Sequence, residues 1–271
     1  MKKLSNISQK HNKAINTTIN AQHFRFELVV VFSVVYQHYR NALWRIMASV
    51  MPQRKIMKSS DIVENWKRFA AAIDKLGGEV KSLFIDEPAT KKEIAILEGQ
   101  LGFELPLSLK EVLLTFSKKV EFRWFFPDGY ELDGALSQIF SGDRHWSLDW
   151  IVQFNDDKNG WKDEVFPNTD DPYDLVWHNK LAFHEVGNGD YLAIDLAQPG
   201  REPVIYLSHD DGEGHGIELA KDFKEFLLIS SRLGCVGAED WQWLPFTEAD
   251  KGFINQTVKM QRNSERPWAL R

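Results

Sequence analysis

Apolar residues recur with helical spacing where the regular part of the chain begins, in residues 61–76. The repeated positions are Ile62, Trp66, Phe69, Ile73 and Leu76. Steps of three and four residues place these side chains along one face of a helix, and Gly77-Gly78 then ends the pattern. We therefore predict an amphipathic helix, capped near Asp61, whose aromatic face packs into a core.

Residues 90–116 predict two further short helices that meet at a corner. Each begins with an S/T-x-x-E capping box, formed by Thr90 with Glu93 and by Ser108 with Glu111. Between them, Gly102 suits the left-handed conformation past a helix end, and Pro106 disfavours helix in the residue before it. The segment is therefore expected to be a helical corner.

Strands are predicted in the middle and the second half of the chain. Residues 120–126 read as one strand before a Pro-Asp-Gly turn, and residues 204–208 as another. Residues 181–186 and 191–196 predict a hairpin. Its turn contains Asn188-Gly189, which favours type I′ geometry with positive φ at both central positions.

A closing helix and an aromatic tail are predicted at the C-terminal side. The helix is marked by Phe223, Phe226 and Leu227 and is expected to end near Gly234. The tail carries three large aromatic residues, Trp241, Trp243 and Phe246. We expect this tail to fold back on the domain.

Residues 139–154 fit either a strand or a helix, and residues 156–174 form the least regular stretch of the chain. We predict a long surface loop there, anchored by Trp161 and Phe166. Its acidic residues are the candidate partner-binding residues, namely Asp156, Asp157, Asp163, Glu164, Asp170 and Asp171. The alternative is that these carboxylates only keep the domain soluble.

Charge divides the chain into two unlike parts. Residues 1–58 hold ten Lys/Arg and one acid, whereas the remainder holds 23 basic and 38 acidic residues, a net charge of −15. We divide the chain into a basic leader (1–57), a domain (58–234) and an aromatic C-terminal extension (235–271). The lone Cys235 excludes an intrachain disulfide and favours a reducing, cytoplasmic location.

The leader has three possible interpretations. Its apolar run, residues 28–36, is shorter than the ~20 residues that a bilayer span needs, so no integral membrane span is expected. The first interpretation of the leader is a membrane-surface or partner-binding extension. The second is a strand or helix added to the domain, and the third is a segment outside the natural product. We favour the last, because Met47, Met51 and Met57 all offer later starts.

Four short motifs, taken in order, resemble one known family. They are E-x-x-L-G-x-x-L-P at residues 98–106, G-N-G-D at 187–190, a strand ending in His209-Asp210, and x-x-F-x-x-F-L at 221–227. This order resembles the SUKH superfamily, the Smi/Knr-type domain of bacterial immunity proteins and a fungal cell-wall regulator, over roughly residues 61–233. The resemblance implies an α+β protein-binding domain, commonly an immunity protein that blocks a toxin.

The segment from His209 to His215 is the one candidate for metal chemistry. Two imidazoles and three carboxylates lie within it, so His209, Asp211 and His215 are candidate ligands. Their spacing matches no standard zinc or calcium loop, and a solvated polar loop is favoured. His184-Glu185 begins an H-E-x-x-H motif, but Asn188 stands at its last position.

The sequence therefore predicts a single α+β domain, with a mixed, mostly antiparallel sheet, N-terminal helices and a closing C-terminal helix packed on it. Its predicted function is non-catalytic protein binding without a cofactor, as an immunity protein that neutralises a basic toxin such as a nuclease. Nucleic-acid binding is disfavoured because an acidic domain repels phosphates. The alternatives are a metal-dependent enzyme using residues 209–215 and a regulatory scaffold.

Overall fold

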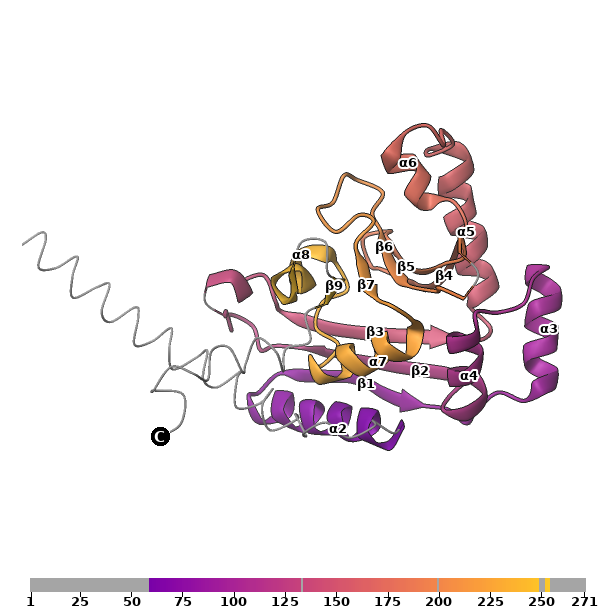
Figure 1. Ribbon diagram of the computed structural model, residues 1–271. Coiled ribbons are helices and arrows are strands. Elements are labelled where there is room, and N and C mark those ends of the chain that lie inside the picture. The colour runs from indigo at the N-terminus through magenta and orange to yellow at the C-terminus, as the bar shows by residue number, and fades with distance from the viewer. Residues whose placement is uncertain (1–58, 133, 199, 249–251, 254–271) are drawn as a thin grey trace, which may run out of the picture.

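Two antiparallel sheets form the centre of the protein (Figure 1). The computed structural model describes residues 59–132, 134–198, 200–248 and 252–253. The first sheet has the order β1-β2-β3, with β1 (Glu79–Ile85), β2 (Lys119–Phe125) and β3 (Ser141–Ser147). The second has the order β4-β5-β6-β7, with β4 (Lys180–Glu185), β5 (Tyr191–Asp195), β6 (Val204–Leu207) and β7 (Glu218–Ala220). A short pair, β8 (Thr247–Glu248) and β9 (Gly252–Phe253), follows.

Helices cover these sheets, and two of them, α5 and α6, lie in the chain between the last strand of the first sheet and the first strand of the second. They are α2 (Ser59–Lys75), α3 (Lys91–Leu101), α4 (Leu107–Thr115), α5 (Ile151–Glu164), α6 (Pro172–Trp177), α7 (Phe223–Arg232) and α8 (Asp240–Trp243), with 3-10 turns at Gly134–Leu136 and Leu244–Phe246. In Figure 1, α2 and α7 lie beside the first sheet, and α5 lies against β4. The predicted α+β class is confirmed, but each strand pairing described is antiparallel and the strands form separate sheets.

The predicted first helix is confirmed as α2. Trp66, Phe69 and Ile73 are buried in the core, and Gly77 after the helix has a φ of 84°. Asp61 lies in the first turn instead of at the cap, because α2 begins at Ser59. The predictions for the leader, residues 1–57, fall outside the described residues.

The helical corner forms with one of its two predicted capping boxes. The Thr90 hydroxyl accepts a hydrogen bond from the Glu93 N–H, and the Thr90 N–H donates the reciprocal bond to the Glu93 carboxylate, as expected. The box of Ser108 with Glu111 is wrong, because α4 begins at Leu107 and Ser108 is already inside it. The carboxylate of Glu202 instead accepts hydrogen bonds from the N–H groups of Leu107 (3.1 Å) and Ser108 (3.4 Å). A residue distant in sequence therefore caps this helix.

The predicted strands and the β4–β5 hairpin are confirmed, but the hairpin turn differs from type I′. Gly189 has a φ of 98°, whereas Asn188 lies outside the positive-φ region. The turn closes through a 2.8 Å bond from Val186 N to Asp190 O. Asn188 uses its side chain here, accepting a bond from Asp190 N and donating one to the Asp190 carboxylate. Asn188 therefore uses its side chain to hold Asp190 in place, and the turn does not adopt the two-residue type I′ conformation.

The predicted loop over residues 156–174 is wrong, because α5 and α6 occupy most of it. Residues 139–154, which fitted strand or helix, contain both β3 and the start of α5. The inward positions of α5 include Ile151, Asn155 and Lys158, spaced by four and three residues. Two of these three buried residues are polar, so the hydrophobic period that normally reveals a helix is weak here.

The main core joins both sheets through large aromatic side chains. Trp66, Trp124 and Trp146 are fully buried in it, and a smaller cluster around Trp177 lies under α5 and α6. The aromatic tail folds back in part. Trp243 and Phe246 are buried in the main core, whereas Trp241 is 42% exposed.

Candidate functional site

The predicted partner-binding residues lie on α5 and in the connection just before α6, and we call this surface the acidic face. It consists of Asp156, Asp157, Asp163 and Glu164 on α5 with Asp170 and Asp171 before α6. All six are exposed. In Figure 1, α5 and α6 lie at the end of the molecule away from α2. The sequence therefore predicted these residues' exposure correctly while missing α5, which carries four of them.

Helical spacing explains how α5 presents its carboxylates. Asp156 and Asp163 are seven residues apart, which is about two turns, so both point the same way. Asp157 and Glu164 are also seven residues apart, and each directly follows a residue of the first pair. These pairs form one stripe, and the buried side chain of Lys158 lies outside it, on the inward side of the helix.

Few of the acidic-face carboxylates are neutralised within the protein. Among the described residues, the only cation paired with one of them is Lys162, whose Nζ lies 2.7 Å from Asp163. Asp171 caps α6 by accepting a 2.8 Å bond from Tyr173 N. Two apolar side chains of the same segment, Val165 and Leu175, are 50% and 51% exposed. The acidic face thus combines uncompensated negative charge with exposed apolar contacts.

The structure does not bring the three metal candidates of residues 209–215 together. His215 Nδ1 accepts a 3.0 Å bond from Ser208 N, and its Nε2 lies 3.1 Å from the carbonyl oxygen of Tyr173. Its ring also stacks on Tyr173, and burial lowers the pKa of the imidazole. Asp211 is exposed, while His209 turns towards Asp190. His215 therefore ties the loop to α6, with both ring nitrogens already in use.

Asp190 organises the loop ends of the second sheet. Its buried carboxylate accepts bonds from the Tyr206 hydroxyl (2.6 Å) and from His209 N (2.9 Å), and lies 2.6 Å from His209 Nδ1. One donor atom from each of Asp190, His209 and Asp210 lies within 4.8 Å of the others. The carboxylate is thus the point where the G-N-G-D and His-Asp motifs meet.

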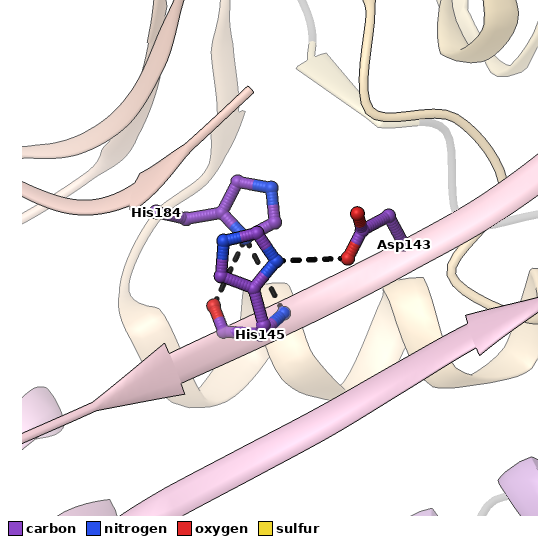
Figure 2. Close-up of side chains that lie close together, drawn as sticks. All are labelled: Asp143, His145 and His184. Carbon is purple, nitrogen blue, oxygen red and sulfur yellow. Dashed lines mark hydrogen bonds and ion pairs between the residues drawn. The ribbon is translucent and has the colours of Figure 1, made fainter. Parts of the chain in front are cut away.

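A second group of side chains was missed by sequence reasoning. Asp143 and His145 project from β3 and meet His184 of β4, as Figure 2 shows, and one donor atom from each lies within 4.8 Å of the others. Asp143 and His145 line a pocket of about 340 Å³, whose walls also include Arg123, Trp150 and Phe154. Positions i and i+2 of a strand share a face, a signal that could have linked Asp143 with His145. Nothing local links them to His184.

Opposing effects set the charges in this group. Burial disfavours a charged Asp143, but the hydrogen bond from His145 and the positive charge of Arg123 hold the pKa of Asp143 well below the usual range. His184 is fully buried, and burial, together with the charges of His145 and Arg144, holds its pKa well below 6.5. An anionic carboxylate therefore lies beside a neutral imidazole.

Residues 88–229, more than half of the chain, match the model of the SMI1 / KNR4 family (SUKH-1). The protein belongs to this family. No curated protein matches the chain. The matched region of this SUKH-1 protein runs from just before α3 into α7, and it contains the acidic face, the Asp190 network and the Asp143–His145–His184 group. None of the described helices is long and apolar enough to cross a membrane.

Proposed function

We propose that this SUKH-1 protein is a non-catalytic protein-binding module of the immunity type, and that its acidic face binds a basic toxin. The observation that carries the proposal is the acidic face itself. Four of its carboxylates are exposed on α5 and two just before α6, and one cation among the described residues is paired with them. An uncompensated negative surface speeds the encounter with a positively charged partner and disfavours partners of like charge.

The chemistry of the partner follows from this surface. A nuclease carries positive charge where it holds the phosphate backbone, so a basic nuclease domain complements the acidic face. Val165 and Leu175 add exposed apolar area beside the charges. Binding energy at interfaces is concentrated in a few desolvated contacts, and these two side chains are our candidates for such contacts.

Growth protection is the direct test. Co-expression of this protein with toxin domains encoded beside its gene should restore growth to cells that the toxin alone arrests. Binding without growth protection would favour a regulatory scaffold over an immunity protein. Failure of both binding and protection, with well-folded protein, would overturn the proposal.

A matched pair of variants tests the position of the interface. Replacing Asp156 and Glu164 by Asn and Gln removes two charges from the acidic face, and neither side chain has a hydrogen bond within the described structure. Replacing the exposed Asp74 and Glu79 removes the same charges from a different part of the surface. The first variant should slow association with the toxin, with the difference fading at high salt, whereas the second should associate normally. Equal association rates for the two variants would move the interface elsewhere.

A further inference from the structure

His184 carries a buried nitrogen atom that no protein group satisfies. Its side chain is completely buried, and its Nε2 has no hydrogen-bond partner. Its Nδ1 lies 2.9 Å from the carbonyl oxygen of His145 and 3.3 Å from the His145 amide. The carbonyl contact is the shorter, so we assign the ring proton to Nδ1 and a lone pair to Nε2. Buried polar atoms without partners are rare, and an ion is one of their common explanations.

This hydrogen-bond pattern is the one that metal-binding histidines use. A ligating imidazole normally donates its other N–H to a carboxylate or a main-chain carbonyl, which fixes the ring and its tautomer. The His145 carbonyl does this for His184. Figure 2 shows that the remaining nitrogen of His184 lies on the side of its ring nearer to Asp143.

The backbone of β4 is adapted to place His184 at this point. The register with β5 shifts between Ala182 and His184, which leaves Phe183 as the extra residue of a β-bulge. A bulge redirects the side chains beside it. His184 thereby reaches across to β3, although β3 and β4 belong to different sheets.

The other two candidate metal ligands, Asp143 and His145, line the pocket. Asp143 binds Arg123 through Oδ2, at 2.8 Å from Nε, and lies 2.9 Å from His145 Nδ1 through Oδ1. The rings of His145 and His184 stack with centroids 3.9 Å apart, so their lone pairs do not yet converge. An ion held by all three side chains therefore requires the partly exposed His145 to turn out of the stack, towards the pocket that it lines, which would free Asp143 Oδ1 for the ion.

We propose that Asp143, His145 and His184 bind a divalent transition-metal ion of the zinc type, which joins the two sheets. Two imidazoles and one carboxylate suit zinc and leave a coordination position open. Two of the three ligands, Asp143 and His145, line the 340 Å³ pocket, from which an ion would enter. The ion would add direct bonds to both strands beside the hydrogen bonds that His184 already makes with the main chain of His145.

Zinc itself is the probe for the test, applied to the full-length chain. His11, His23 and His38 also lie in the sequence, so zinc stoichiometry is interpreted as a difference between variants. By calorimetry, the wild-type protein should bind one zinc equivalent more than His145→Ala, and zinc should raise the melting temperature of the wild type only. His145 is partly exposed, which makes its replacement compatible with folding.

The matched control is His209→Ala, which alters the Asp190–His209–Asp210 group instead. This control should keep the extra equivalent and the thermal shift. Asp143→Asn provides a second variant should His145→Ala misfold, and it should weaken zinc binding more than about tenfold. Equal zinc binding by wild type and His145→Ala overturns the proposal, as does a loss confined to His209→Ala. Absence of zinc binding by the wild type overturns it too.

Discussion

The hydroxyl of Tyr206 donates a 2.6 Å hydrogen bond to the carboxylate of Asp190, and Asp190 is only 1% exposed. Burial and the adjacent carboxylate raise the pKa of Tyr206 far above its usual value, which keeps the phenol protonated as a donor. The contact links the residue before β5 to β6, and the same carboxylate accepts a bond from His209 N in the loop after β6. The last residue of the G-N-G-D motif, Asp190, therefore serves in this chain as a buried hydrogen-bond acceptor.

Tyr206→Phe is expected to destabilise the protein by about 2 kcal/mol, because it leaves a buried carboxyl group with one hydrogen bond fewer. Asp190→Ala should cost more, since the Tyr206 hydroxyl and the His209 amide both lose their acceptor. Urea denaturation monitored by tryptophan fluorescence measures both. A change below about 0.5 kcal/mol for Tyr206→Phe would show that the bond contributes little in solution.

Glu202→Ala should destabilise the protein by about 1 kcal/mol, because the first N–H groups of α4 lose their acceptor. Glu111→Ala is the matched control. Glu111 is exposed and pairs with Lys224 at the surface, so its loss should change stability very little. Thermal denaturation of both variants decides whether the distant carboxylate or the local capping box acts at this helix.

Gly142→Ala should cost about 1–3 kcal/mol, because a methyl group there would overlap the indole ring of Trp124. That ring is fixed, since its Nε1 donates a 2.7 Å bond to the carbonyl oxygen of Gly234. Gly99→Ala provides the contrast, because its added methyl group meets no atom within 4 Å and α3 gains helix propensity. We expect Gly99→Ala to stabilise the protein by about 0.5–1 kcal/mol, and equal effects of the two substitutions would contradict the packing argument.

Glu93 should titrate with a pKa of about 2 in the folded protein, compared with its usual 4.5. The main-chain bond from Thr90 is the largest cause, followed by bonds from the Thr90 and Lys118 side chains. Because the folded pKa is lowered, the contribution of this cap is complete above about pH 4.5 and is lost as the pH falls towards 2. Carboxyl carbon shifts measured by NMR give this pKa directly, and Thr90→Ala should move it back upwards. A titration midpoint near 4.5 in the wild type would show that the capping box does not form.

Local interactions decided what the sequence alone could predict. The Thr90 capping box, the amphipathic helix around Trp66 and the β4–β5 hairpin depend on residues close together in the chain. Such features leave a readable spacing, because the donors, acceptors and apolar faces lie within a few residues of one another. The exposure of the acidic face was predictable for a similar reason, since dense carboxylates rarely enter a core.

The tertiary structure alone decided the features whose partners lie far apart in sequence. Glu202 caps α4 from another part of the chain, and the buried Asn155 and Lys158 hide the helical period of α5. His184 meets His145 because a bulge in one sheet turns it towards the edge of the other. The physical reason is common to all three: the free energy of these contacts comes from groups that become neighbours only when the whole chain has folded.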